Sequence, residues 1–469
     1  MRQVLVIYDD KRIPNREIRS ITGNRSFGKT IFKRVSLEDR TREKLKSIRH
    51  VRAVSTMDET NDPDSFLTAG SEEPILRIFS DFLIEDLYEV SVLAEKTCYI
   101  NEEYSVYCNG RVAAVLYPDT DSFLKRNDAL LERYERIPGK GLVDLSELGN
   151  FRQFITSGFD ARYFNALKGD KYTVVKHSSN KTKIRAEYEY YKFIPEDMKM
   201  WYAIPFDYKE SEEGASYTME RFFMTDLALR YVHGSIDVSE FEMIMRKLFY
   251  FLDIRKKKEV SKEEYEETVK KLYIDKVEER IATLKNLEQY KLIEEYIRSG
   301  SNYSSIDEIL NRYKALYNKI RGRVKNKREL VVGHGDLCFS NILYNRDIDL
   351  LKLIDPKGAL KEEDIYTDPY YDICKLSHSI CGSYDYFNSD LFEIALEDNM
   401  KLSLKVDNDN SEFIDIFKKY LSMAGIDFNY VRILETSLFL SMLPLHIDRV
   451  KKVFAFILNA LRIMDTLEE

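Results

Sequence analysis

The sequence predicts an α+β protein with more than one domain, and three observations support this prediction. The chain has 469 residues, more than one ordinary domain contains. Over residues 1–145, short apolar runs alternate with charged, helix-like segments, which favours a separate α/β domain at the N-terminus. Over residues 239–325, opposite charges recur at helical spacing, which favours a largely helical region with solvated faces.

Three apolar runs in the first 145 residues are predicted to be buried strands: Val4–Tyr8, Pro74–Phe79 and Arg111–Tyr117. A helix is predicted over Ser36–Ile48, because a serine followed closely by acidic residues is typical of a helix start. Residues 136–150 concentrate proline and glycine and are predicted to be a linker. The N-terminal α/β domain should therefore end near residue 145.

The segment Gly23–Thr30 matches the phosphate-loop pattern G-x-x-x-x-G-K-T. The pattern binds phosphate when a buried strand leads into it and a helix leads out, because backbone N–H groups then converge on the anion. Here the lead-in, residues 16–21, is half charged, and the lead-out, residues 31–35, is at least as strand-like as helical. This context disfavours a nucleotide-binding loop.

The overall composition is that of a globular protein. Hydrophobic residues make up 44% and charged residues 32% of the chain. There are 72 basic and 80 acidic side chains, which gives a net charge of -8. Because the two signs are interspersed, no nucleic-acid partner is expected.

The five cysteines are scattered and form no Cys-x-x-Cys pair, so neither a zinc site nor a disulfide framework is expected. No signal peptide and no apolar stretch of about 18 residues are evident, and Thr436–Leu445 is better interpreted as a buried helix. A cytoplasmic location without a membrane span is therefore expected.

The stretch Val331–Gly358 carries the strongest chemical signal in the chain. It alternates apolar segments with polar turns and places Asp336, Asn341 and Asp355 at the ends of neighbouring elements. Phosphoryl transfer needs a carboxylate that orients and deprotonates the attacking hydroxyl, together with oxygen ligands for Mg²⁺. Asp336 suits the first task, and the other two suit the second. The alternative is a purely structural strand pair, in which these polar residues cap the turn and face the solvent.

Protein kinases use the same Asp-x-x-x-x-Asn spacing. The strings HGDLCFSNIL and IDPKG resemble the aminoglycoside phosphotransferase and choline kinase superfamily, over roughly residues 150–469. This resemblance implies Asp336 as catalytic base, Asn341 and Asp355 as Mg²⁺ ligands, and His334 as a brace of the loop.

The resemblance also implies a bilobal protein-kinase-like fold. A small β-rich lobe would cover residues 150–225 and a large helical lobe residues 226–469. In the small lobe, Lys176 ends a β-branched run where the phosphate-binding lysine of this fold belongs, and Glu187, in a helix predicted over Thr182–Phe193, would pair with it.

Further contacts with ATP are implied in the same lobe. The stretch Phe151–Phe164 would hold its first strands, with Ser157 and Gly158 in the turn that covers the phosphates. Tyr217–Phe222 fits the hinge strand whose backbone would bond the adenine, and Met219 lies within it. Downstream, Asp372 resembles a structural cap rather than a catalyst.

The predicted function is that of an enzyme, an ATP- and Mg²⁺-dependent kinase acting on a hydroxyl of a small molecule such as a sugar, polyol or amino alcohol. By analogy with bacterial surface-polysaccharide pathways, a role in making a capsule is a further expectation. One alternative is a catalytically silent kinase-fold module that regulates or scaffolds a partner. Another is a fusion of two enzymes, in which residues 1–145 form a degenerate nucleotidyltransferase domain. The acidic strand end Phe79–Phe82 suggests this alternative. The oligomeric state stays open.

Overall fold

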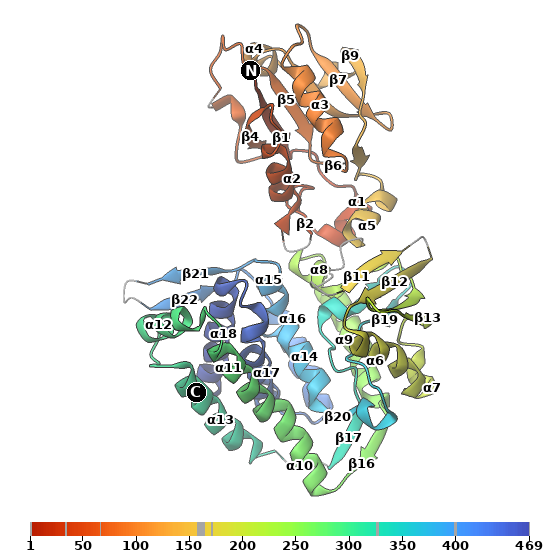
Figure 1. Ribbon diagram of the computed structural model, residues 1–469, viewed down its shortest axis with the longest axis vertical. Helices are drawn as coiled ribbons and strands as arrows, with labels where there is room; N and C mark the ends of the chain where they lie inside the picture. The colour runs from red at the N-terminus through yellow and green to blue at the C-terminus, as the bar shows by residue number, and fades with distance from the viewer. Residues whose placement is uncertain are drawn as a thin grey trace. The chain divides into compact units, whose positions relative to one another are not determined.

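The computed structural model describes residues 2–32, 35–65, 67–156, 165–169, 172–324, 328–397 and 401–468 (Figure 1). Helices and sheets are mixed throughout, which confirms the predicted α+β class. The chain divides into two compact units. The first comprises residues 1–160 with 233–235, and the second residues 161–232 with 236–469.

A six-stranded mixed sheet forms the centre of the first unit, in the order β4-β1-β5-β8-β7-β9. Strand β1 runs parallel to β4 and β5, while β8 runs antiparallel to β5 and β7. The strands are β1 (Val4–Asp9), β4 (Val51–Met57), β5 (Ile75–Phe79), β7 (Tyr104–Cys108), β8 (Arg111–Tyr117) and β9 (Glu135–Pro138). The three predicted strands are confirmed as β1, β5 and β8, and all of β1 and β5 is buried because helices cover this part of the sheet.

The helices of the first unit are α1 (Arg16–Thr22), α2 (Leu37–Lys46), α3 (Leu87–Thr97), α4 (Thr120–Leu124) and α5 (Leu148–Thr156). Ser36 caps α2 by accepting a hydrogen bond from the Asp39 amide, as its position predicted. Leu45 of α2 and Val90 of α3 join the strands in one core. Two small antiparallel pairs complete the unit: β2 (Ile31–Phe32) with β3 (Val35–Ser36), and β6 (Phe82–Ile84) with β10 (Leu142–Asp144).

Two predictions about the first unit are wrong. Residues 136–150 are not a linker, because β9 belongs to the main sheet and β10 pairs with β6. The beginning of Phe151–Phe164 is helical, not a strand: Phe151 and Phe154 lie one turn apart on α5 and are buried, and Phe151 packs edge-on against Phe27.

The second unit begins with an antiparallel sheet of four strands in the order β11-β12-β14-β13. The strands are β11 (Asn165–Gly169), β12 (Thr173–Ser178), β13 (Pro205–Glu210) and β14 (Ala215–Glu220). Helix α6 (Lys181–Phe193) confirms the predicted helix and packs on this sheet, with Ile184 against Ala215 and Tyr217. Asn180 caps α6 through the Lys183 amide.

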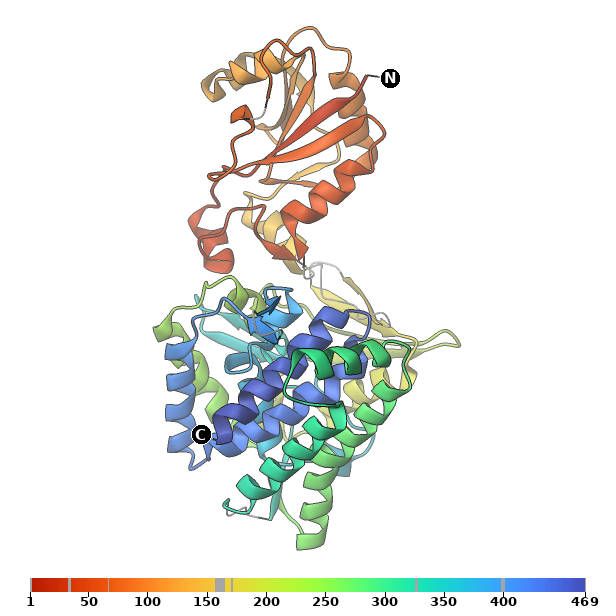
Figure 2. The ribbon, with the colours of Figure 1, turned by 90° about the vertical axis from the view of Figure 1, so that its left-hand side faces the viewer.

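Most of the second unit is helical. The helices are α7 (Glu196–Lys199), α8 (Leu227–Val232), α9 (Val238–Ile254), α10 (Lys262–Lys270), α11 (Lys276–Lys285), α12 (Tyr290–Gly300), α13 (Ile306–Arg321), α14 (Tyr370–Ile380), α15 (Tyr384–Asn388), α16 (Ser411–Met423), α17 (Phe428–Met442) and α18 (Val450–Glu468). A short π-helical turn, Lys271–Asp275, joins α10 to α11. Helix α17 packs against α11, α13, α14 and α18, and Figure 2 shows these long green and blue helices side by side. The buried helix predicted over Thr436–Leu445 is therefore confirmed as the end of α17 and the turn after it.

Short strands in the second unit carry the polar loops. They are β15 (Thr225–Asp226), β16 (Lys257–Glu259), β17 (Glu329–Val332), β18 (Ile342–Asn345), β19 (Leu350–Leu353), β20 (Tyr366–Thr367), β21 (Glu393–Leu396) and β22 (Leu402–Lys405). Strand β17 pairs with β16 and β20, and β18 pairs with β15 and β19. Within the described ranges, no helix is long and apolar enough to cross a membrane.

Candidate active site

A buried lysine on β12 lies between two carboxylates. The Nζ atom of Lys176 is 2.7 Å from Oε2 of Glu187 and 2.7 Å from Oδ1 of Asp355. Its side chain is 3% exposed and that of Glu187 2%, whereas that of Asp355 is 38% exposed. The structure thus joins β12, α6 and the segment after β19 through one ammonium group.

The two carboxylates of this triad stabilise the charge of the lysine between them. Burial opposes the charged form of Lys176, but the carboxylates of Asp355 and Glu187 outweigh it and raise the pKa of the lysine. Burial raises the pKa of Glu187, although Lys176 opposes the shift. Tyr217 also donates a hydrogen bond to Glu187, at 3.3 Å. Removing the lysine would therefore leave a buried carboxylate without its main partner.

His334 braces the turn that follows β17. Its ring is fully buried, its Nδ1 atom accepts the Asp336 amide at 3.2 Å, and its Nε2 atom lies 3.0 Å from the Ile354 carbonyl. With Nδ1 as an acceptor, Nε2 carries the hydrogen and donates it. Burial lowers the pKa of His334, so the imidazole is neutral. The ring also stacks on Tyr202.

The same turn presents the carboxylate of Asp336. The side-chain amide of Asn341 donates to the Asp336 carbonyl at 2.8 Å and to its Oδ2 atom at 3.1 Å. The Nζ atom of Lys375, from α14, lies 2.9 Å from the other carboxylate oxygen, Oδ1. Both oxygens of Asp336 are thereby oriented from two different elements.

The first helical turn of α14 also binds the loop that follows β17. The Asp372 carboxylate accepts the amides of His334, at 2.9 Å, and Gly335, at 2.8 Å, and it pairs with Arg255 at 3.1 Å. Asp372 is fully buried. It braces the backbone of the turn between β17 and β18 rather than the end of its own helix.

The segment after β19 docks onto α6. Asp355 has a φ of 54° and Gly358 a φ of 87°, both in the left-handed region. The Ala359 amide then donates to the carbonyl of Ala186 at 2.9 Å, next to Glu187. This contact holds Asp355 and Glu187 on one framework around Lys176.

The remaining predicted contacts have different outcomes. Ser157 and Gly158 lie outside the described residues. Met219 lies in β14 between Val174 of β12 and Pro205 of β13, so its backbone is enclosed by partner strands on both sides. The chain leaves this sheet after Glu220, and the next amide, of Arg221, donates to the Tyr172 carbonyl at 2.9 Å.

Sequence reasoning missed Lys375. The available signal was its position three residues after Asp372 in a helical pattern, which puts both side chains on one face of α14. No group of three or more His, Cys, Asp or Glu side chains suited to a metal ion is found in the part of the chain that the structure covers.

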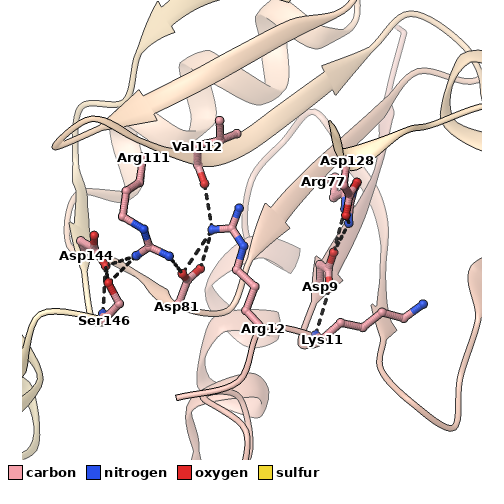
Figure 3. Close-up of polar contacts among 10 residues, drawn as sticks. All are labelled: Asp9, Lys11, Arg12, Arg77, Asp81, Arg111, Val112, Asp128, Asp144 and Ser146. Atoms are coloured by element: carbon pink, nitrogen blue, oxygen red, sulfur yellow. Dashed lines mark hydrogen bonds and ion pairs between the residues drawn. The ribbon is translucent and has the colours of Figure 1, made fainter. Parts of the chain in front are cut away.

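In the first unit, arginines hold the acidic side chains at the ends of β1 and β5 (Figure 3). Asp81, 1% exposed, pairs with Arg12 at 3.0 Å and with Arg111 at 2.6 Å. Asp9 accepts a hydrogen bond from Arg77 at 2.7 Å. Arg77 also binds Asp128, and in a separate network Arg111 also binds Asp144, which accepts the Ser146 hydroxyl. Guanidinium groups thus already neutralise this strand edge.

The segment Gly23–Thr30 does not have the strand-loop-helix context of a phosphate loop. Helix α1 leads into it and β2 leads out. The Gly28 amide donates to the Asp10 carboxylate at 2.7 Å, and Lys29 pairs with Glu38 at 2.6 Å. The amide and the ammonium group that would bind a phosphate therefore bind acidic side chains of the protein itself.

Solved structures similar to this chain include aminoglycoside phosphotransferases. The chain resembles this group. A thermostable mutant of aminoglycoside phosphotransferase APH(4)-Ia in its apo form is 8% identical, with 64% of this chain and 94% of that chain covered and a TM-score of 0.36. APH(3'')-Id from Streptomyces rimosus, in complex with ADP and streptomycin, is 14% identical, with 64% and 98% covered and a TM-score of 0.34.

The resemblance predicted from the sequence and these solved structures name the same group of proteins. No family model and no curated protein sequence matches the chain. Both TM-scores are below 0.5, so these matches carry no weight for the function of this chain.

Proposed function

We propose that the second unit is a bilobal kinase that transfers the γ-phosphoryl group of ATP to a hydroxyl of a small molecule. The observation that carries this proposal is the buried Lys176, which pairs with Glu187 on one side and with Asp355 on the other. A lysine held by a helix glutamate and an aspartate near the metal is the arrangement that kinases require for ATP phosphates. The small lobe would begin at the start of the second unit, near residue 161, and end near residue 225, and the large lobe would follow it.

Each residue of the site has a role in this proposal. Lys176 binds the α- and β-phosphates, and Glu187 orients it. Asp336 accepts the proton of the attacking hydroxyl, while the hydroxyl oxygen forms a bond to the γ-phosphorus. The bond between that phosphorus and its bridging oxygen breaks, and ADP leaves with the electron pair. His334 and Asp372 keep the loop backbone in place for this step.

The donor set is suited to magnesium. Mg²⁺ prefers a few oxygen ligands from protein and takes the rest from phosphates and water. Asp355 is more than one-third exposed, and Asn341 turns its amide nitrogen toward Asp336, so its amide oxygen faces the other way. These two residues would hold the ion, which neutralises phosphate charge when bound.

The acceptor class is the finer part of the proposal. We favour a sugar, a polyol or an amino alcohol, including the building blocks of surface polysaccharides. The experiment measures ATP consumption by the purified protein with Mg²⁺ against a panel of such compounds. One acceptor should support turnover, and Asp336→Asn should abolish it.

Asp347→Asn is the matched control, because Asp347 is an exposed aspartate in the turn between β18 and β19. It should keep the activity of the wild type. ATP binding without turnover on any acceptor would contradict the proposal and favour the catalytically silent module.

A further inference from the structure

Lys375 of α14 pairs with Asp336, and none of the roles proposed above belongs to this lysine. The Nζ atom of Lys375 is 2.9 Å from Oδ1 of Asp336, and the side chains are 14% and 39% exposed. The lysine end of this ion pair is enclosed, so the pair is screened less than one between two fully exposed side chains. Lys375 therefore bears directly on the orientation of the carboxylate.

The ion pair has a rigid frame. Asp372, one turn earlier on α14, holds the amides of His334 and Gly335 through its two carboxylate oxygens. Residues three apart share a helix face, so Asp372 and Lys375 both face the loop. The backbone and the carboxylate of Asp336 are thus fixed to the same helix.

The charge state of Lys375 is set by its surroundings. Burial favours the neutral amine, but Asp336 outweighs this effect, with smaller contributions from Tyr371 and Cys338, and the pKa of Lys375 is raised above its ordinary value. His378, one turn further along α14, is buried with a lowered pKa and is therefore neutral. The ammonium is charged throughout the neutral range.

The loop itself brings no positive charge to this place. The residues between Asp336 and Asn341 are Leu337, Cys338, Phe339 and Ser340, all of them uncharged. Lys176 is bound by two other carboxylates, Glu187 and Asp355. Phosphoryl transfer depends on positive groups near the transferred oxygens, and α14 supplies one that the loop lacks.

We propose that Lys375 is the positioning residue of Asp336, an inference that rests on the phosphotransferase activity proposed above. Its ammonium holds one oxygen of the Asp336 carboxylate while the Asn341 amide holds the other, so that the carboxylate stays aimed at the acceptor hydroxyl. Lys375 itself gains and loses no proton.

The test compares Lys375→Met, Lys375→Arg and the wild type with Mg²⁺, ATP and the acceptor found in the panel. Lys375→Met should lower kcat by about 100-fold, because a misplaced catalytic carboxylate can cost about that much, with little change in KM for ATP. Lys375→Arg should restore part of kcat, because its guanidinium can pair with the same carboxylate.

Lys276→Met is the matched control, since Lys276 also reaches α14, donating to the Tyr371 hydroxyl at 3.0 Å. It should keep the kcat of the wild type. A methionine variant of Lys375 with unchanged kcat, or an arginine variant that restores none of the loss, would overturn the inference. Should that variant fail to fold, Lys375→Gln should show the same loss. Failure of the proposed function appears separately, as a wild type without turnover, and would overturn both claims.

Discussion

Asp368 is a buried carboxylate whose charge has a cost in the folded protein. It is fully buried, and it accepts hydrogen bonds from the hydroxyls of Tyr273 at 2.7 Å and Tyr265 at 3.2 Å. Burial raises its pKa from 3.8 to about 6, since the two hydroxyls compensate only part of the lost hydration. The folded state therefore favours the protonated form of this residue.

This shift predicts a pH dependence of stability that belongs to one residue. The stabilising contribution of Asp368 is present below its ordinary pKa and is lost as the pH rises through about 6. Asp368→Asn removes this titration. The difference in free energy of unfolding between wild type and variant should change by about 3 kcal/mol between pH 3 and pH 8. Denaturant unfolding at several pH values measures it, and a constant difference would contradict the prediction.

At the scale of single residues, the sequence anticipated contacts that depend on a motif. The pairing of Lys176 with Glu187 was predicted, and the structure adds Asp355, which follows β19, as a second partner of the lysine. Their catalytic roles stay predictions. Lys375 was missed, because its partner Asp336 lies 39 positions away and only the packing of α14 makes the pair.

At the scale of elements, the contact between the Asp355 segment and α6 depends on a glycine. Gly358 has a φ of 87°, and a Cβ atom there would lie 2.6 Å from the backbone carbon of Ala186. Gly358→Ala should therefore push the segment away from α6. Activity should fall by about 100-fold if the segment moves by about 1 Å, since Asp355 would leave its place beside Lys176.

The matched control for Gly358 is Gly425→Ala. Gly425 has a φ of 68° with nothing within 4 Å of a Cβ atom, so its replacement adds backbone strain of about 1 kcal/mol without a clash. It should lower stability slightly and leave kcat unchanged. Turnover assays and thermal unfolding measure both variants, and equal activity of the two would contradict the proposed docking role of Gly358.

Elements with a local signal were predicted well. Ser36 caps α2, and β-branched or apolar runs form β1, β5 and β12. Residues 136–150 were mistaken for a linker because their proline and glycine mark turns, whereas the pairing of β9 and β10 with β7 and β6 is a long-range property. Helix α5 was mistaken for a strand, although its buried phenylalanines are spaced by three residues.

At the scale of the whole molecule, the sequence indicated a separate N-terminal region but placed its end too early. The first unit continues to about residue 160, since α5 packs through Phe151 on Phe27 and Phe154 on Phe32. Composition could not reveal this, because the packing partners lie more than 120 residues apart. The function of the first unit is therefore better judged from the acidic ends of β1 and β5 than from the position of its boundary.

That strand edge bears on whether the protein also transfers nucleotidyl groups. Such a reaction would need the acidic end of β5 to hold a cation, yet both oxygens of Asp81 already bind guanidinium groups, Arg12 at 3.0 Å and Arg111 at 2.6 Å. A metal ion there would leave two arginines without their shared buried partner, which is costly. We therefore predict no release of pyrophosphate from CTP or other nucleoside triphosphates by the full chain, whatever sugar phosphate or phosphorylated amino alcohol is added. Mg²⁺-dependent release that is lost in Asp81→Asn but kept in Asp336→Asn would contradict this prediction, and it would establish a second enzyme in the same chain.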